Sequence, residues 1–371
     1  MKPGVLLVAN WKSDVGYAWW LMESYWRVIS ETLSDKYTIY LAFPELNEVP
    51  ETLKNGKIKF VEFPFYNVSQ DLSGSVSFIK QHNIEVLYFT DFRYASPLYL
   101  RFRMAGVKHI INHDHTPGHR TTPTGLKRWL KKLYFNLPLL RADKIFAVTP
   151  FVKQRAQNTV QLNADYCAVI PNGIYPLKGS QQAPAERDDV AALKLVSVSR
   201  VSEYKNLSFI VAVIKRCVER GLTNIHWTHY GDGPYMNGLQ QEVTKAGLQN
   251  HVTLAGKVPS VDKLLGQYDI GFQSSRGEVG YSLSILEMMR AGLPVLAPDN
   301  PSVCGATAHG KTGYIYREDD VNDAVEGVAQ YYQQPPQIQA HGAAAIDVFG
   351  EKYNLHNTHD VLRKEIKKVI A

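Results

Sequence analysis

Two basic side chains lie five residues apart in a polar segment between an apolar run and an amphipathic run. Arg200 and Lys205 belong to the segment Ser-Arg-Val-Ser-Glu-Tyr-Lys-Asn, residues 199–206. A forked guanidinium and a compact ammonium beside the start of a helix suit the charges of a diphosphate. A second interpretation stays open, in which both side chains are solvated loop cations. The first interpretation predicts an anion site on this loop.

A second segment, residues 276–295, combines glycines with a single acid in an apolar run. Its loop enters a predicted helix, whose first turn presents N–H groups to an anion. The residues expected to supply these groups are Gly280, Tyr281, Ser282 and Leu283. Glu287 lies farther along the helix among Ile, Leu and Met residues. A carboxylate there can accept both hydroxyls of a ribose, so we expect it to face a ligand; the alternative is a surface glutamate without a role.

Other phosphate-binding motifs are not found in the sequence. No Gly-x-Gly-x-x-Gly follows a predicted strand, and Gly231-Asp232-Gly233-Pro234 lacks the third glycine of that motif. No Walker A sequence is present either. The sequence therefore disfavours a nicotinamide-dependent dehydrogenase and a P-loop NTPase.

The elements that must position these residues are short apolar runs that alternate with helix-length amphipathic segments. The runs are continuous and rich in β-branched residues, as in parallel strands covered on both faces. They predict strands over residues 5–9, 38–42, 58–63, 86–90, 109–112, 144–148, 194–199, 226–230, 252–255, 270–273, 294–297 and 313–316. This pattern indicates two doubly wound α/β domains of Rossmann type. Ligands of such sheets bind beyond the carboxyl ends of the strands, so we expect a site in a central cleft between the domains.

The boundary between the domains is expected in residues 171–191, which are rich in Pro, Gly, Gln and charge and have no periodicity. We expect an N-terminal, acceptor-side domain over residues 1–174 and a donor domain over residues 175–351. A C-terminal helix over residues 352–371 is expected to pack back on the first domain.

Composition sets limits on compartment and partners. The 371 residues carry a net charge of +6, and residues 1–170 hold 21 Lys and Arg against 14 Asp and Glu. A basic first half favours an anionic partner, or is a solubilising bias. Three separated cysteines and no Cys-x-x-Cys pair suit a reducing compartment. No apolar run is long enough to span a membrane and no signal peptide is evident, so we expect a cytoplasmic protein.

The second half resembles the donor domain of the family 4 retaining glycosyltransferases with the GT-B fold, a family active in bacterial polysaccharide and lipopolysaccharide synthesis. The matching pieces occur in the family's order. They are Ser199-Arg200 with Lys205-Asn206, Tyr230-Gly231-Asp232-Gly233-Pro234, Val252-Thr253-Leu254-Ala255-Gly256, Tyr268-Asp269-Ile270, the Glu278 to Glu287 segment, Ala291-Gly292-Leu293-Pro294-Val295 and Gly310-Lys311-Thr312-Gly313. The likeness is good over residues 140–320 and weak before them.

The resemblance implies a role for each of these residues. Glu278 would contact hydroxyls of the donor sugar and Glu287 the nucleotide ribose, although eight residues separate them where the family has seven. Arg200 and Lys205 would neutralise the departing diphosphate, so no metal or other cofactor is expected beyond the nucleotide sugar itself. The further donor contacts that it implies are at Gly231, Pro234 and Gly16, the last in the loop after the first strand.

Two histidines are candidates for contact with the donor sugar. His113 and His115 lie in the segment Asn-His-Asp-His-Thr-Pro-Gly-His, residues 112–119, and the family carries a histidine here. We favour His115, because it lies farther beyond the predicted strand. The alternatives are a metal site that also uses His119, and loop histidines without a role.

The segment from Thr124 to Leu137 has the pattern of a basic amphipathic helix. At 100° per residue its leucines and Trp129 share one stripe, and four lysine and arginine side chains lie opposite. Such a helix could lie on an anionic bilayer. The alternative is a helix packed on its own domain with a solvated basic face.

Together these observations predict a metal-independent, retaining glycosyltransferase of the hexosyltransferase type. It would use a nucleotide-diphosphate sugar and a saccharide or lipid-linked saccharide acceptor, in the cytoplasm or on the cytoplasmic face of the inner membrane. The alternatives are a non-catalytic sugar-nucleotide-binding protein of the same fold, or an epimerase of that fold. No nucleic-acid recognition module is evident.

Overall fold

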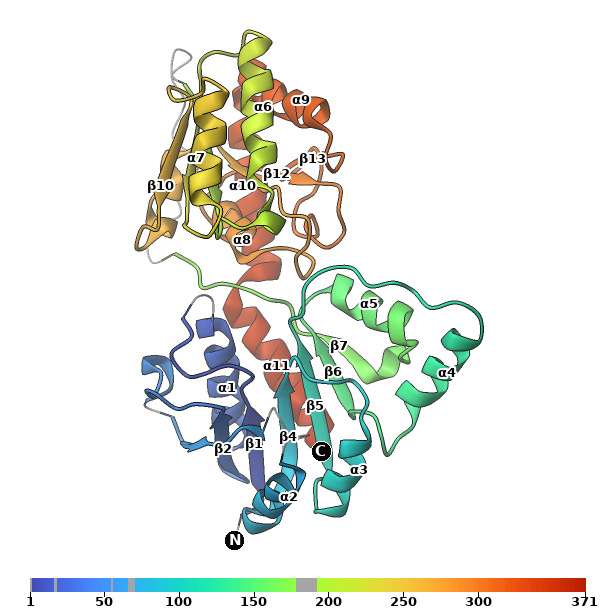
Figure 1. Cartoon of the computed structure of the whole chain (residues 1–371). Coiled ribbons are helices and arrows are strands. Elements are labelled where there is room, and N and C mark those ends of the chain that lie inside the picture. The colour runs from blue at the N-terminus through green and yellow to red at the C-terminus, as the bar shows by residue number, and fades with distance from the viewer. Residues whose placement is uncertain (1, 17–18, 55, 66–70, 178–191) are drawn as a thin grey trace. The chain divides into compact units, whose positions relative to one another are not determined.

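The computed structural model describes residues 2–16, 19–54, 56–65, 71–177 and 192–371 (Figure 1). It divides the chain into two compact units. Unit 1 contains residues 1–116, 120–172 and 356–371, and unit 2 contains residues 117–119 and 173–355. Most of the expected linker, residues 178–191, lies outside the described residues.

Unit 1 is built on a seven-stranded parallel sheet with the strand order β3-β2-β1-β4-β5-β6-β7. Its strands are β1 (Gly4–Val8), β2 (Thr38–Phe43), β3 (Ile58–Glu62), β4 (Ile84–Thr90), β5 (His109–Asp114), β6 (Lys144–Ala147) and β7 (Cys167–Val169). Its helices are α1 (Trp20–Leu33), α2 (Leu72–Gln81), α3 (Pro97–Met104), α4 (Gly125–Asn136), α5 (Pro150–Val160) and α11 (Leu355–Ile370). Every residue of β1 is buried, because helices cover both faces of the sheet.

The C-terminal helix α11 packs within unit 1, beside α1 (Figure 1). Leu362 and Ile366 of α11 are fully buried. Ser24 Oγ of α1 lies 3.1 Å from His359 Nε2, and Thr358 Oγ1 donates to the carbonyl of Pro171 at 2.8 Å. The end of the chain therefore contributes to the core of the unit that its beginning forms.

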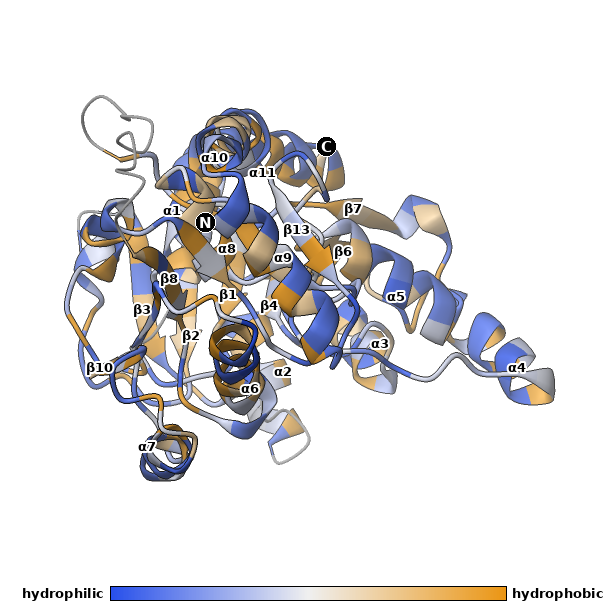
Figure 2. Cartoon of the chain, turned by 90° about the horizontal axis from the view of Figure 1, so that it is seen from above, coloured by the Kyte–Doolittle hydropathy of each residue, from blue (hydrophilic) through white to orange (hydrophobic). Residues whose placement is uncertain are grey.

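Unit 2 is built on a six-stranded parallel sheet with the strand order β10-β9-β8-β11-β12-β13. Its strands are β8 (Leu193–Val198), β9 (Ile225–Tyr230), β10 (Val252–Gly256), β11 (Ile270–Phe272), β12 (Val295–Pro298) and β13 (Gly313–Tyr316). Its helices are α6 (Leu207–Glu219), α7 (Met236–Lys245), α8 (Leu283–Arg290), α9 (Val321–Gln333) and α10 (Pro336–Val348). Hydropathy colouring shows the apolar residues concentrated in the strands and on one side of the covering helices (Figure 2).

The predicted fold class is confirmed, and each predicted strand is present within two residues of its expected ends. The short strand β7 was not predicted, because three residues are too few to form a recognisable apolar run. In each sheet the strand order reverses once, between β1 and β4 in unit 1 and between β8 and β11 in unit 2. Loops that follow neighbouring strands on the two sides of a reversal diverge and leave room for a ligand.

The loop after β9 packs closely against the loop after β8, and glycine makes this possible. Gly231 has φ +137°, and a Cβ atom there would lie 1.9 Å from the carbonyl oxygen of Ser199. The two loops are also joined by hydrogen bonds from Ser199 N to the Tyr230 carbonyl and from Val201 N to the Asp232 carbonyl. Gly231 thus fixes the position of the loop that carries Arg200.

We predict that Gly231→Ala destabilises unit 2 by about 3 kcal/mol, because the added methyl group forces the two loops apart. Urea unfolding followed by the fluorescence of Trp227, which is buried in the core of unit 2, measures the change. Gly238→Ala is the control, since its Cβ meets nothing within 4 Å. Because Gly238 lies inside helix α7, the control substitution should leave the free energy of unfolding unchanged or raise it by about 0.5–1 kcal/mol. Equal stability of the two variants would contradict this role of Gly231.

Candidate functional site

In unit 2 the predicted residues gather at the carboxyl ends of β8 and β11, on the two sides of the reversal in strand order. Lys205 ends a short 3-10 turn, Glu203–Lys205, in the loop after β8. Glu278 lies in the loop between β11 and α8. The Lys205 ammonium and the Glu278 carboxylate form an ion pair, although 73 residues separate them. The structure therefore brings together two residues that the sequence offered as separate candidates.

Lys205 is held from three directions. Its side chain is only 10% exposed, its carbonyl accepts a hydrogen bond from Ser274 Oγ at 2.8 Å, and its ammonium lies 4.8 Å from the centre of the Tyr204 ring. Three N–H donors on an ammonium leave capacity for phosphate oxygens beside Glu278. Arg200 lies on the same loop and is exposed.

The loop that carries Glu278 is fixed by two polar residues that sequence analysis did not identify. Ser302 accepts the N–H of Glu278 through its Oγ at 3.4 Å and the N–H of Gly280 through its carbonyl at 2.7 Å. Asn300 orients Ser302 by accepting its N–H at 3.0 Å and its hydroxyl at 2.7 Å. The expectation that the Gly280 N–H is available to an anion was wrong, because a loop from beyond β12 takes this donor.

The start of α8 is built by Ser282 and a buried glutamine. Ser282 Oγ caps the helix by accepting the N–H of Ile285 at 3.4 Å, and Gln273 Nε2 donates to the same oxygen at 2.8 Å. Gln273 Oε1 accepts the N–H groups of Ser274 and Ser275 at 2.9 and 3.1 Å. Gln273 was missed, since one amide at the end of a strand has no periodic signal. Its side chain connects the loop after β11 to the helix.

Tyr281 and Leu283, predicted as donor contacts, lie on either side of this cap. Tyr281 is buried, and its ring packs edge-on against Tyr353 at 5.1 Å. Its ring therefore serves the packing of the unit. Leu283 begins α8, where an α-helix leaves its first N–H groups without intrahelical partners. Pro234 is exposed in the loop after β9.

Glu287 lies on α8, half-buried, close to Arg290 and Asp262. Burial raises the pKa of Glu287 to about 7, the attraction of Arg290 opposes this shift, and the charge of Asp262 adds to it. Arg290 is itself engaged, since it donates to the Tyr175 carbonyl at 2.6 Å and to Asp262 Oδ2 at 3.2 Å. A carboxyl whose pKa lies near neutrality is typical of functional sites. The role of Glu287 in binding a ribose stays a prediction.

In unit 1 the two candidate histidines are adjacent but differently placed. His113 is fully buried on β5, with Nδ1 2.6 Å from the hydroxyl of Tyr88. Its burial, together with the nearby ring of His115, holds the pKa of His113 well below its ordinary value. His115 follows the strand, and its ring lies 4.3 Å from that of His113. His113 therefore supports the ring of His115 from the core side.

The backbone around His115 is held by two aspartates. Its N–H donates to Asp91 Oδ1 at 2.5 Å. Asp114 accepts the N–H of Thr116 at 2.9 Å and forms a buried ion pair with Arg155 at 3.0 Å. Burial lowers the pKa of His115 to about 4, against the attraction of Asp114. At neutral pH the imidazole is therefore uncharged and can both donate and accept a hydrogen bond.

Several buried polar atoms near His115 have no hydrogen-bond partner in the part of the chain that the structure describes. They are Asn10 Oδ1, Thr90 Oγ1, His113 Nε2, and Nδ1 and Nε2 of His115. These residues follow or end β1, β4 and β5, which are neighbours in the sheet. An unpaired buried polar group costs roughly 1–3 kcal/mol, so such a group of atoms at a strand edge favours a ligand rich in hydroxyls.

Asp91 is the acid of this cluster, and sequence analysis did not identify it. It directly follows β4 and adopts a left-handed conformation, φ +55°. Burial, together with the charge of Asp114, raises its pKa to about 7. Its position directly after a strand, on the side of the reversal opposite to Asn10, is the signal that could have found it.

The remaining expectations concern Gly16 and a metal. Gly16 adopts φ +73° and is exposed after β1, as a tight turn requires. His119 belongs to unit 2, where its Nε2 lies 2.9 Å from Asn300 Oδ1. Within the described ranges, no three His, Cys, Asp or Glu side chains are arranged to hold a metal ion.

Two family models match the chain, one in each half. The model described as "Glycosyltransferase Family 4" matches residues 22–176, and the model described as "Glycosyl transferases group 1" matches residues 192–334. Together they cover most of both units, including the loops of Lys205, Glu278 and His115.

Solved structures share this fold over nearly the whole chain. HepE of Anabaena, crystallised in complex with UDP, aligns over 99% of this chain and all of its own with a TM-score of 0.72 at 15% identity. The lipopolysaccharide outer core galactosyltransferase WaaB in its apo form aligns over 99% of each chain with the same score and identity. The expected GT-B fold is confirmed.

Among curated proteins, a GDP-mannose-dependent α-(1-6)-phosphatidylinositol monomannoside mannosyltransferase of Mycobacterium tuberculosis is 23% identical over 72% of this chain and 71% of its own. With other curated relatives the match is shorter and spans only 28–40% of their length.

We predict that Glu287→Gln stabilises the protein above about pH 7. Because the pKa of Glu287 is raised from 4.5 to about 7 on folding, the wild-type protein loses stability as the pH rises through this window. Glutamine does not ionise and so avoids this loss. Above about pH 7 the free energy of unfolding of the variant should exceed that of the wild type by on the order of 1–3 kcal/mol. Below about pH 4.5 the two proteins should have similar stability.

Thermal unfolding across this pH range measures the difference. Glu242→Gln, at an exposed position on α7, is the control and should show no such pH-dependent gain. A stability difference for Glu287→Gln that does not vary with pH would contradict the buried, proton-binding carboxyl.

Proposed function

Because the chain belongs to the glycosyltransferases that these two family models describe, we propose that it transfers a sugar from a nucleoside diphosphate sugar to a saccharide or lipid-linked saccharide. The observation that carries this proposal is the pairing of Lys205 with Glu278 beside the capped start of α8. Phosphate-binding and hydroxyl-binding groups lie side by side there, at the reversal of strand order in unit 2.

The diphosphate would bind between the loop after β8 and the start of α8. Lys205 would supply a compact charge, Arg200 a forked guanidinium, and the first turn of α8 N–H groups and the positive end of its dipole. Glu278, fixed against Lys205, would accept hydroxyl groups of the donor sugar. Glu287, farther along α8, would accept the two hydroxyls of the ribose in its ionised form.

In the reaction that we propose, the bond between the sugar C1 and the diphosphate oxygen breaks while the acceptor hydroxyl oxygen bonds to C1. The acceptor attacks from the face that the diphosphate leaves, so the configuration at C1 is retained. The hydroxyl proton passes to the departing phosphate oxygen, which balances the charge. Lys205 and Arg200 stabilise the negative charge that develops on the diphosphate.

Unit 1 would contribute to recognition of sugars through His115. Its uncharged imidazole and the neighbouring Asn10 carry hydrogen-bonding atoms that hydroxyl groups can satisfy. Asp91 would act by holding the backbone of His115 in place. A location in the cytoplasm, or on the cytoplasmic face of the inner membrane, belongs to the same proposal.

The nucleotide is best sought among the two that occur in the names of similar proteins. HepE binds UDP, and the mycobacterial mannosyltransferase uses GDP-mannose. A thermal-shift screen with UDP-sugars and GDP-sugars tests both, because a ligand of the folded state raises the unfolding temperature.

We predict that Lys205→Ala lowers release of nucleoside diphosphate from the donor found in this screen by about 10²–10³-fold. Loss of the ammonium removes the charge that stabilises the leaving group. Slow hydrolysis of the donor gives a readout that needs no acceptor. Lys245→Ala, at an exposed position in α7, removes the same charge from the same unit and should turn over like wild type.

Turnover of Lys205→Ala at the wild-type rate would overturn the proposed site. Tight donor binding by the wild-type protein with no turnover in the presence of candidate acceptors would instead favour a sugar-nucleotide-binding protein without transferase activity.

We further predict that excess EDTA leaves turnover unchanged, because in this proposal two basic side chains and a helix N-terminus neutralise the diphosphate. The measurement is donor turnover before and after chelation, followed by addition of manganese. Loss of activity on chelation that manganese restores would show that a metal ion stabilises the leaving group.

A further inference from the structure

Helix α4 exposes a group of large apolar side chains. No residue of this helix is buried, and Trp129 is 60% exposed and Leu126 72% exposed. The exposed apolar residues on and just after the helix are Leu126, Trp129, Leu130, Leu133, Leu137 and Leu139; we call them the α4 patch. Of the other large exposed apolar residues of the described chain, no more than two, Leu100 and Met104 of α3, lie on one helix. A contiguous patch of this kind marks an interaction surface.

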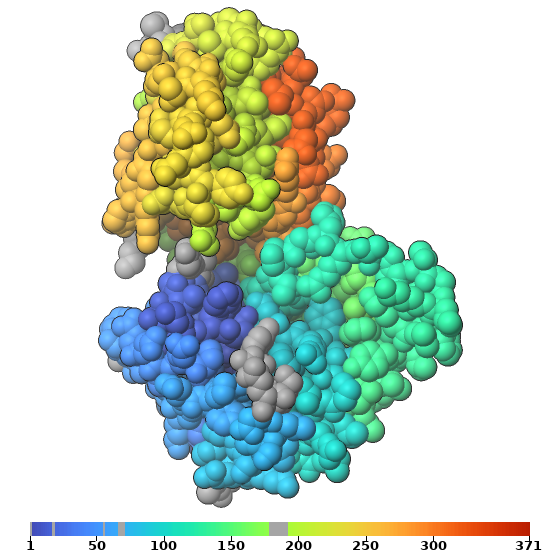
Figure 3. Space-filling model, viewed as in Figure 1, coloured from blue at the N-terminus to red at the C-terminus, as the bar shows by residue number. Residues whose placement is uncertain are grey.

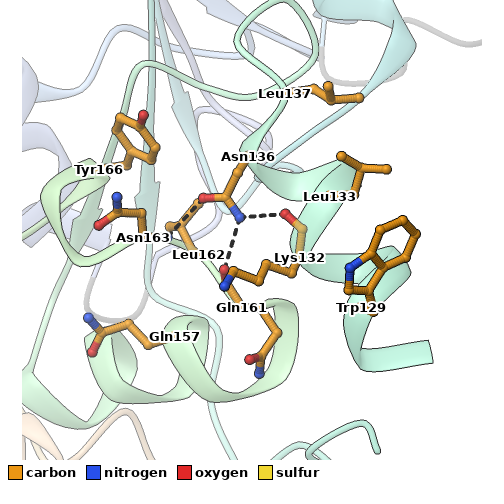
Figure 4. Close-up of a pocket in the computed structure, with 10 residues that line it drawn as sticks. All are labelled: Trp129, Lys132, Leu133, Asn136, Leu137, Gln157, Gln161, Leu162, Asn163 and Tyr166. Atoms are coloured by element: carbon orange, nitrogen blue, oxygen red, sulfur yellow. Dashed lines mark hydrogen bonds between the residues drawn. The ribbon is translucent and has the colours of Figure 1, made fainter. Parts of the chain in front are cut away.

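The helix is nevertheless attached to unit 1, by polar contacts on another side. Arg128 Nε donates to Gln161 Oε1 at 2.9 Å, and Lys131 Nζ donates to the carbonyl of Thr159 at 3.0 Å. Asn136 Nδ2 donates to the Gln161 carbonyl at 2.9 Å. Figure 4 shows Trp129 and Leu133 pointing away from Asn136 and Gln161, which take part in these contacts. These bonds hold the helix while Leu126, Trp129, Leu130 and Leu133 stay at least half exposed.

The position of α4 agrees with this orientation. The helix lies at the periphery of unit 1, farther from the sheet than α5 (Figures 1 and 2), and its region forms part of the outer surface (Figure 3). An open hollow of about 700 Å³ lies between α4 and α5. The apolar side chains of Trp129 and Leu133 line one wall of it, and Gln157 and Tyr166 belong to the other (Figure 4).

Charge around the patch has one sign. Lys127 and Lys132 lie on the two flanks of the apolar stripe at 100° per residue. No acidic residue occurs in the sequence between Asp114 and Asp143, a stretch that also contains Arg120. An apolar stripe with cations on both flanks matches the interface of an anionic bilayer, where acyl chains meet negative headgroups.

From these observations we infer that the α4 patch docks on an anionic lipid bilayer, with its apolar side chains at the boundary of headgroups and acyl chains. In this proposal α4 lies along the surface of the bilayer. Among the described helices none is long and apolar enough to span a bilayer. The basic surroundings of the patch disfavour a second copy of the chain as its occupant, because a symmetric contact would bring cations of both copies close together. The inference does not depend on the proposed chemistry.

The test is co-sedimentation of the full chain with phosphatidylcholine vesicles, with and without phosphatidylglycerol. Binding should require phosphatidylglycerol and weaken as salt is added. The double variant Lys127→Gln with Lys132→Gln should lower the partition coefficient for the vesicles about 30-fold. Each lysine near an anionic surface contributes ~1 kcal/mol of binding free energy, and 1.4 kcal/mol corresponds to a tenfold change in an equilibrium constant. Lys36→Gln with Lys80→Gln removes the same charge from exposed positions elsewhere in unit 1 and is the matched control.

A second pair of variants separates the apolar contribution from charge. Leu130→Ser with Leu133→Ser should abolish sedimentation with the vesicles, whereas Met104→Ser, at a single exposed apolar residue of unit 1, should not. Thermal shift with UDP and GDP on the same variants shows that the fold and any nucleotide site are intact.

Three results would overturn the inference. The first is equal binding of the protein to vesicles with and without phosphatidylglycerol. The second is a loss of vesicle binding in the control variant Lys36→Gln with Lys80→Gln as large as that in Lys127→Gln with Lys132→Gln. The third is a concentration-dependent dimer in sedimentation velocity that the leucine variants abolish. Vesicle binding by a protein that binds no nucleotide would leave this inference standing and would remove support from the proposed function.

Discussion

The ion pair between Lys205 and Glu278 determines the arrangement of the site in unit 2. It joins the loop after β8 to the loop after β11 across the point where the strand order reverses. Both side chains are mostly buried, so their attraction is weakly screened, but the cost of desolvation offsets much of it. The pair therefore fixes the positions of the two loops more than it stabilises the fold. It holds a cation suited to phosphate and an acid suited to hydroxyls within contact of each other.

The two units offer different electrostatic environments, which suit different parts of a glycosyl transfer. Unit 2 places charged groups where a diphosphate would carry negative charge, and Ser302, Asn300 and Gln273 hold their loops. Unit 1 instead buries an imidazole that is uncharged at neutral pH, His115, beside polar atoms without partners. Fixed charge stabilises a leaving group, whereas neutral hydrogen-bonding groups distinguish hydroxyls without strong attraction to phosphate.

Much of this fold follows from local sequence patterns, but the site depends on long-range contacts. Continuous apolar runs predicted both sheets, because burial on two faces leaves a clear signature. The donor of Gly280 was assigned wrongly, since its partner Ser302 lies 22 residues away beyond another strand. Gln273 and Asp91 were missed because single polar residues at strand ends have no periodicity. The position of Asp91 beside the loops of Asn10 and His115 follows from the strand order, in which β1, β4 and β5 are neighbours, and no local sequence pattern contains this information.

The same limit explains why α4 had two interpretations. Apolar residues at helical spacing indicate that one face avoids water, but the spacing is identical whether protein or lipid covers it. The contacts show how the helix is attached to its own unit. Arg128, Lys131 and Asn136 use polar bonds to fasten the helix to α5, which leaves its leucines outside the core. A helix that needed its apolar face for folding would bury it, and the exposure of this face supports the proposal that it binds a partner outside unit 1.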